Sequence, residues 1–333
     1  MSGQPLDQIV NQLRRSDEYR IIQKYKKPIG YNLDSEVSND ASAKTEDKLI
    51  GVYLDIEATG LLYSSDKLIE LGMVKFEYTQ DGRIFNLLEE FSGYQDPNIP
   101  ISGFITKLTG INDDMVRGHS IDEDKVSEYL KDVDIIIAHN AQFDRAFFET
   151  TFPNIAPKAW ACSMRDINWN DEDISSFKLE YIAYRYNFFF EGHRAIIDCL
   201  AGIHILAQNL IISKVPVLKR LLNNTSQLEF KLWTKNAPYD SKDLLKVRNY
   251  RWGMHPTNNY KAWYISIPES YVEEEIKYLR SDIYKTNASI TLEIEIFDAF
   301  NKYSIIGNNK EYINNKYEDK LIWARRLQEA KAG

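Results

Sequence analysis

The stretch LIGVYLDIEATG, residues 49–60, marks where the main domain of this chain begins. A short apolar run rich in β-branched residues ends at a Thr-Gly turn, a pattern that predicts a buried strand. Asp55 and Glu57 stand two residues apart in this strand, so their side chains point to the same face. Both carboxylates can therefore reach the same metal ions.

Outward from this strand, the sequence predicts strands and helices in alternation. A second strand (68–78) and a third (83–94) follow across turn residues, and a further buried run, VDIIIAHN, comes later. Helical patterns occupy residues 122–130, 141–150 and about 196–210. A meander followed by strand-to-helix alternation favours an α/β domain, with a mixed sheet and flanking helices.

Changes in composition divide the chain into four parts. Residues 1–48 are predicted to form an N-terminal helix, to about residue 26, and then a polar flexible linker. The main domain is assigned to residues 49–212. Residues 213–304, with alternating strand and helix patterns, are assigned to a small α+β accessory domain, and residues 305–333 to a charged C-terminal tail.

Composition limits the class of protein. In 333 residues, 44% are hydrophobic and 27% charged, which is typical of a globular protein. No apolar run approaches the roughly 20 residues of a membrane span, and the first residues lack the apolar region of a secretory signal, so we expect a cytoplasmic protein without a membrane partner. The net charge of −8 argues against a nucleic-acid binder of the histone kind but leaves a local basic groove possible. Cys162 and Cys199 are expected to be reduced.

Further acids and a histidine lie on separate predicted elements. Asp144 follows the strand IIIAH at the start of a helix, and His193 and Asp198 flank the start of the last helix. Phosphodiester hydrolysis on two metal ions needs several converging carboxylates and a base for the attacking water. Taken singly, each residue also has a structural explanation, such as a helix-start acid or a loop histidine.

Three motifs containing these residues resemble the DEDDh exonucleases, the DnaQ-like group that includes proofreading subunits of bacterial replicative polymerases. They are YLDIEATGL (53–61), AHNAQFDRAFF (138–148) and GHRAIIDC (192–199). Ala58 replaces the first threonine of the family's Asp-x-Glu-Thr-Thr-Gly-Leu motif. With the connecting segments ITKLTGI and WACS, the resemblance covers about residues 48–210. It implies a ribonuclease H-like exonuclease fold.

Beyond that region, the segment KLWTKNAPYDSKDLLKVRNYRW (231–252) and the early EYRII resemble bacterial proteins described as polymerase III epsilon-like, which carry an extra C-terminal module.

The resemblance also implies roles for individual residues. Asp55 would bridge two divalent cations, Mg²⁺ or Mn²⁺; Glu57 and Asp198 would hold the one that carries water, and Asp144 would support the other. His193 would be the general base, because an imidazole titrates near neutral pH.

Substrate contacts are expected from Thr59, Gly60 and Leu61, and from Phe143 and Asn140. Two alternatives stay open: Phe143 fits the core equally well, and Asn140 fits a role in ordering the turn before Asp144.

A second candidate surface lies in residues 231–264, where seven basic residues and seven aromatics are interleaved with two acids. Exposed rings could stack on bases while lysines and arginines track phosphates, as in single-strand binders. The alternative is that the tryptophans, among them Trp233, form the core of the small domain and the charges are only solvated.

The sequence is therefore interpreted as a divalent-metal-dependent 3′-to-5′ exonuclease that releases nucleoside 5′-monophosphates from single-stranded or frayed DNA ends. RNA is the competing substrate, since the site residues do not read the sugar. The alternative from another class is a non-catalytic adaptor that binds a polymerase or other replication protein.

Overall fold

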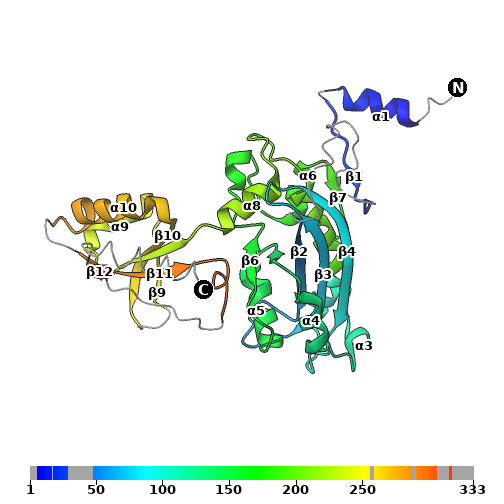
Figure 1. Ribbon diagram of the computed structural model, residues 1–333, viewed down its shortest axis with the longest axis horizontal. Helices are drawn as coiled ribbons and strands as arrows, with labels where there is room; N and C mark the ends of the chain where they lie inside the picture. Colours follow the sequence, from blue (N-terminus) through cyan, green and yellow to red (C-terminus); the bar gives the residue numbers. More distant parts are fainter. Residues whose placement is uncertain are drawn as a thin grey trace. The chain divides into compact units, whose positions relative to one another are not determined.

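The computed structural model describes residues 6–16, 18–28, 48–255, 259–286, 290–305 and 315–316. The chain forms two compact units (Figure 1). The first contains the described residues up to Thr225 together with a short stretch that begins at Tyr303. The second contains the described residues of Ser226–Lys302 together with Asn315–Lys316. Most of the predicted linker and nearly all of the predicted tail lie outside the described residues.

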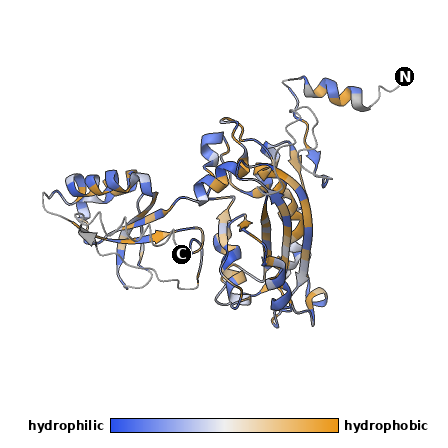
Figure 2. Cartoon of the chain, viewed as in Figure 1, coloured by the Kyte–Doolittle hydropathy of each residue, from blue (hydrophilic) through white to orange (hydrophobic). Residues whose placement is uncertain are grey.

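A five-stranded sheet in the order β4-β3-β2-β5-β6 forms the centre of the first unit. Strands β2 (Leu49–Ala58), β3 (Leu68–Tyr78) and β4 (Ile84–Tyr94) make an antiparallel meander. Strands β5 (Ile135–Ala138) and β6 (Ala159–Cys162) run parallel to β2. The predicted mixed sheet is confirmed, and β2, which carries Asp55 and Glu57, is its central strand. The hydropathy colouring is mainly apolar along these strands (Figure 2).

Helices cover both faces of this sheet. On one face, Tyr53 and Val74 pack with α6 (Leu179–Arg185), α7 (Ala195–Leu206) and α8 (Val217–Thr225). On the other, Val52 and Leu54 pack with α4 (Glu123–Leu130) and α5 (Ala141–Thr151). Side chains alternate along a strand, so Asp55 and Glu57 share the face of Tyr53 and lie toward α7. Short helices α2 (Gly103–Thr109) and α3 (Asp113–Val116), the 3₁₀ turn η2 (Trp169–Glu172) and β7 (Phe188–Phe189) complete the unit.

Two glycines allow α7 to lie close to the sheet. A Cβ atom on Gly72 of β3 would come within 2.6 Å of the backbone carbonyl carbon of Ala195, and one on Gly202 within 2.1 Å of the Tyr53 ring. Cys199 also donates its thiol to the Gly72 carbonyl at 3.4 Å. The first turns of α7 are thus set directly over β2 and β3.

The N-terminal segment differs from the prediction. Helix α1 spans Leu6–Arg14, whereas the described residues near 23 are extended and form β1 (Gln23–Lys24), parallel to β7. The apolar residues before Tyr25 predict a helix, but the backbone of this segment pairs with β7 instead: Gln23 N–H donates to Asn187 O and Tyr25 N–H to Phe189 O. A tertiary partner overrides the local helical pattern here.

The second unit is a small α+β domain with an antiparallel sheet in the order β12-β11-β8-β10-β9. Its strands are β8 (Glu229–Thr234), β9 (Arg251–Met254), β10 (Lys261–Pro268), β11 (Thr291–Phe297) and β12 (Asn315–Lys316). Its helical elements are η3 (Tyr239–Ser241), α9 (Lys242–Val247), α10 (Glu269–Tyr278) and the π turn η4 (Leu279–Ile283). They share a core with Phe230 and Leu232.

The boundary between the units lies after Thr225, whereas the composition predicts a domain boundary after residue 212. The difference is helix α8, whose buried Val217, Leu218 and Leu221 pack into the core of the first unit. Among the described residues, no helix combines the length and the apolar character needed to cross a membrane.

Candidate metal and catalytic site

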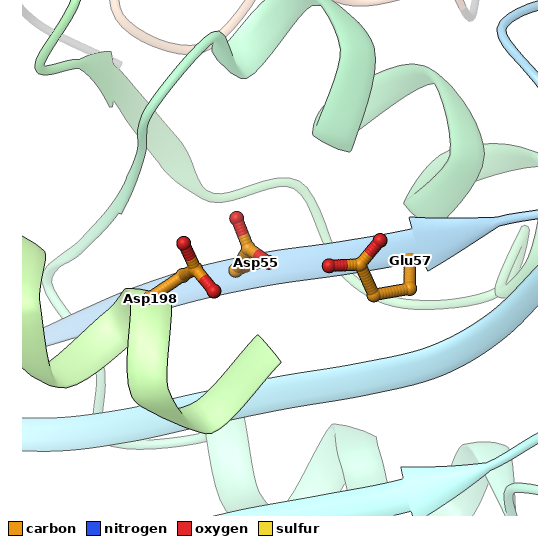
Figure 3. Close-up of side chains that lie close together, drawn as sticks. All are labelled: Asp55, Glu57 and Asp198. Atoms are coloured by element: carbon orange, nitrogen blue, oxygen red, sulfur yellow. The ribbon is translucent and has the colours of Figure 1, made fainter. Parts of the chain in front are cut away.

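Three carboxylates converge where α7 crosses β2. Ligand oxygens of Asp55, Glu57 and Asp198 all lie within 4.8 Å of one another. Asp55 and Glu57 come from one face of β2, and Asp198 projects toward them from the first turns of α7 (Figure 3). Hard divalent cations prefer such clusters of carboxylate oxygens.

Backbone groups at the start of α7 orient Asp198. Its Oδ2 accepts a hydrogen bond from the N–H of Arg194 at 3.1 Å, and the His193 amide also bonds the carboxylate. The motif spacing between His193 and Asp198 therefore corresponds to a closed turn at the helix start. The side chain satisfies donors that the helix itself leaves free.

The carboxylates of the cluster oppose one another's ionisation. Burial, followed by the charges of Asp198 and Asp144, raises the pKa of Asp55 well above its usual range. Burial and Asp198 raise the pKa of Glu57 to about 8, and burial raises that of Asp198 to about 7. Low dielectric and like charges both oppose ionisation.

Asp144 lies beside the cluster, buried at 3% exposure in the first turn of α5. Its Oδ1 accepts a hydrogen bond at 3.2 Å from the N–H of Ile56, the residue between Asp55 and Glu57. Burial also raises its pKa well above the ordinary value. Asp144 is thus held against β2 but is not part of the group within 4.8 Å.

His193 stands in the loop before α7 with a half-exposed side chain. Its Nε2 is 3.8 Å from Oε1 of Glu180 on α6. Its backbone is left-handed, with φ 66°, which is uncommon for a residue with a Cβ atom. The structure therefore presents the imidazole at the surface, next to the helix start that carries Asp198.

Sequence reasoning missed Glu70 and Arg194. Glu70 of β3 is the register partner of Glu57 and is 1% exposed, and the Arg194 guanidinium bonds it at 2.9 Å. The signal was available, because Glu70 is an acid inside the otherwise apolar run LIELGMV. Such a buried acid requires a partner.

The histidine of the second motif, His139, is structural. Its Nδ1 accepts from Ser163 Oγ at 2.9 Å, and Ser163 in turn accepts from the Tyr53 hydroxyl at 2.8 Å. Its Nε2 donates to the Phe177 carbonyl at 2.6 Å. Burial lowers its pKa to about 4, so this imidazole is neutral and connects β2, β6 and the segment before α6.

The predicted substrate contacts lie in different settings. Thr59 closes the loop after β2, since its Oγ1 accepts from Lys67 N–H at 3.0 Å, while a Cβ atom on Gly60 would meet the Asp66 carboxylate. Leu61, at the tip, is 82% exposed.

The two open alternatives concern α5. Phe143 is half-buried against the core, with its ring 4.8 Å from that of Phe147. Asn140 has φ 89° and makes no side-chain cap to α5, and its carbonyl accepts from Phe143 N–H at 2.7 Å. These contacts agree with core and turn roles, and substrate contact stays a prediction for both.

In the second unit, the structural alternative is favoured for the basic and aromatic segment. Trp233 is 1% exposed and donates its Nε1–H to Glu295 at 2.6 Å. Lys231 lies 3.7 Å from Glu295, and Lys235 lies 3.7 Å from Glu293. Much of this segment's positive charge is therefore balanced within the unit, although Trp252 is 55% exposed.

Comparison with known proteins agrees with this geometry. A family model described as exonuclease matches residues 52–206. DNA polymerase III PolC-type of Caldanaerobacter subterraneus subsp. tengcongensis is 30% identical over 194 residues, covering 54% of this chain but 13% of that protein. PolC-type polymerase III of Listeria monocytogenes is 32% identical over 186 residues, covering 54% of this chain and 12% of the relative. The chain thus spans only a small part of the curated relatives it matches.

Among solved structures, exonuclease X in complex with 5′ overhanging duplex DNA is 20% identical and covers 53% of this chain and 92% of that one, with a TM-score of 0.36. E. coli exonuclease I in complex with a dT13 oligonucleotide is 14% identical and covers 70% of this chain and 71% of that one, with a TM-score of 0.44.

Proposed function

We propose, from the match of residues 52–206 to a family model described as exonuclease, that this protein is a divalent-metal-dependent 3′-to-5′ exonuclease of the DnaQ-like group. The observation that carries the proposal is the convergence of Asp55, Glu57 and Asp198 within 4.8 Å, with Asp144 bonded to the same strand. Four neighbouring acids contribute nothing to the packing of a core, and each raises the pKa of the others, which indicates a functional site.

The donor set fits two divalent cations. All four side chains are carboxylates, the oxygen ligands that Mg²⁺ and Mn²⁺ favour. The neighbouring Glu70 is already paired with Arg194. The four remaining carboxylates carry four negative charges when ionised, which two divalent cations would balance.

In the proposed mechanism, Asp55, Glu57 and Asp198 would hold the cations and Asp144 of α5 would support them. The bound cations would acidify the attacking water and offset the charge that develops on the phosphate. His193, whose side chain is half-exposed, accepts the proton of the attacking water. The exposed loop tip at Leu61 meets the terminal nucleotide, while Thr59 and Gly60 shape that loop.

We propose a single-stranded or frayed 3′ end of DNA as the substrate and nucleoside 5′-monophosphates as the product. The names of the relatives, DNA polymerases of the PolC type, support DNA over RNA. A cytoplasmic location and contact with a polymerase belong to the same proposal. A binding assay on the immobilised protein tests that contact: we expect it to retain a replicative polymerase at low salt and to release it at high salt.

Digestion of 5′-labelled single-stranded DNA and RNA of one sequence, with Mg²⁺, Mn²⁺ or EDTA, tests the activity. We expect a ladder that shortens from the 3′ end with either metal, disappears in EDTA and is faster on DNA. His193→Ala should slow it by about 10²- to 10⁴-fold, the usual effect of losing a general base, and leave a measurable residual rate. Lys131→Ala, which removes only an exposed partner of Glu128, should not slow it. Intact substrates under every condition would instead favour the non-catalytic adaptor.

A further inference from the structure

Glu70 is the most completely buried acid around the candidate site. It is 1% exposed and sits on β3 directly opposite Glu57 in the strand register. Both of its oxygens are used within the protein. Arg194 donates to them from Nε at 3.3 Å and from Nη2 at 2.9 Å, and Ala195 N–H donates to Oε2 at 3.1 Å. Glu70 therefore binds both the side chain and the backbone at the start of α7.

Arg194 is held at several points in turn. Besides Glu70, its Nη2 donates to the Tyr94 hydroxyl on β4 at 2.6 Å, and its guanidinium carbon lies 5.8 Å from the centre of the Tyr94 ring. A planar guanidinium fork fixed by a buried carboxylate and a phenol has little freedom to rotate. Three neighbouring elements, β3, β4 and α7, are thereby joined at one residue.

That residue is the immediate neighbour of His193. The backbone of His193 is left-handed, with φ 66°, and the N–H of Arg194 donates to Asp198 Oδ2 at 3.1 Å. A residue with a Cβ atom persists in this conformation only where its surroundings impose it. The Glu70–Arg194 ion pair, the Ala195 N–H bond to Glu70 and the Arg194 N–H bond to Asp198 together hold the backbone after His193.

We propose that Glu70 and Arg194 form a positioning pair that sets the orientation of His193 toward the metal site. This inference rests on the proposed function, in which His193 is the general base. Neither member of the pair is assigned a contact with substrate or cation: the oxygens of Glu70 are occupied, and the guanidinium is directed to Glu70 and Tyr94.

A double-mutant cycle between Arg194→Gln and His193→Ala tests the proposal. If Arg194 acts through His193, Arg194→Gln should lower kcat about 10- to 100-fold, as loss of an orienting partner does, and leave KM within about threefold. In the His193→Ala background the same change should lower the residual rate by less than about twofold. Arg194→Lys should restore only part of the rate, because one ammonium cannot bond Glu70 and Tyr94 with a planar fork.

Lys24→Gln is the matched control. It removes an exposed ion pair with Glu191, two residues before His193, at 2.7 Å. This variant should keep kcat and KM. Glu70→Gln, which changes the other member of the pair, should lower kcat in the same way as Arg194→Gln. Thermal unfolding of each variant shows whether it is folded.

Histidine NMR of the metal-free protein gives a readout that does not depend on activity. The chain has five histidines, and the His193 signal is the one missing from His193→Ala. Arg194→Gln should shift or broaden that signal and leave those of His139, His204 and His255 unchanged; the His119 ring lies beside Tyr94 and is not used as a reference. Lys24→Gln should leave the His193 signal unchanged.

Several results would contradict or support the positioning role of Arg194. Equal rate losses in both backgrounds, or an effect confined to KM, would overturn the positioning role and assign Arg194 to substrate contact. An unmoved His193 signal in a folded Arg194→Gln protein would also overturn it. A His193 signal that moves in a protein without nuclease activity would support the positioning pair while rejecting the exonuclease proposal.

Discussion

The N–H of Ile56 donates a hydrogen bond to Oδ1 of Asp144 at 3.2 Å, so helix α5 is joined to β2 between the two candidate metal ligands of that strand. Because Asp55 and Glu57 flank Ile56, this bond holds Asp144 and the start of α5 next to both acids. Four acids from three segments of the sequence thus converge through one backbone hydrogen bond and one helix crossing.

Replacing Asp144 separates its charge from this bond. In Asp144→Asn the amide oxygen can still accept from Ile56 N–H, but the negative charge near the cations is lost. We expect cleavage to fall by at least about 100-fold, since electrostatic groups at such sites contribute several kcal/mol. The melting temperature of the metal-free protein should hold or rise, because burial already opposes that charge. Wild-type turnover in the variant would reject the assignment of Asp144.

The pH dependence of stability should reveal the acid cluster. With the pKa of Glu57 raised to about 8 and that of Asp198 to about 7, the folded state keeps protons that the unfolded chain releases near pH 4. Unfolding therefore releases protons in this window, and the metal-free protein loses stability as pH rises from about 4 to 8.

Calorimetry in EDTA should accordingly give a lower melting temperature at pH 8 than at pH 5.5. Mg²⁺ or Mn²⁺ should raise it more at pH 8, because cations and protons compete for the same oxygens. Glu57→Gln should flatten the metal-free trend. A larger metal effect at pH 5.5 than at pH 8 would contradict the raised pKa values.

The crossing of α7 over β2 should tolerate no added methyl group. Gly202→Ala puts a Cβ atom 2.1 Å from the buried Tyr53 ring, so we expect a loss of about 1–3 kcal/mol or more in the free energy of unfolding. Gly103→Ala is the control, because nothing lies within 4 Å of its Cβ position at the start of α2. That change should be neutral or stabilising by up to about 1 kcal/mol. Urea unfolding of both variants measures the contrast, and similar values would disprove the close crossing.

The segment after the second unit should contribute to the stability of the first. Tyr303 donates its hydroxyl to Asp166 Oδ1 at 2.7 Å, and Asp166 Oδ2 accepts from Cys162 N–H of β6 at 2.7 Å. Tyr303→Phe removes the hydroxyl bond and should reduce the free energy of unfolding by about 1 kcal/mol. Tyr271→Phe, at an exposed tyrosine of α10, should have no measurable effect. Equal stability of the two variants would show that the Tyr303 bond contributes nothing.

The sequence predicted the parts of this fold that depend on local pattern. The buried run VDIIIAHN predicted strand β5, and the helical spacing around Asp144 predicted helix α5, both in the first unit. The spacing of Asp55 and Glu57 correctly predicted that they share a face, because side-chain alternation in a strand is a local property.

What the sequence did not reveal depends on partners distant in the chain. Glu70 and Arg194 are 124 residues apart, and neither has a local pattern that names the other. The extended β1 forms only because β7 is present, and α8 belongs to the first unit only because its apolar side finds the core there. The predicted roles of the site residues in binding cations, base catalysis and substrate contact await the experiments above.

The stretch at Tyr303 also has a consequence for the covalent connection of the two units. The described chain leaves the first unit after Thr225, returns at Tyr303, and contributes Asn315–Lys316 to the second unit's sheet. It therefore passes between the units three times. A protease that cuts either of the two later passages would leave the units joined by the covalent link after Thr225. A cut at that first link would instead leave the residues up to Thr225 joined to the rest of the protein through the noncovalent contacts of the returning stretch, such as the hydrogen bond from Tyr303 to Asp166.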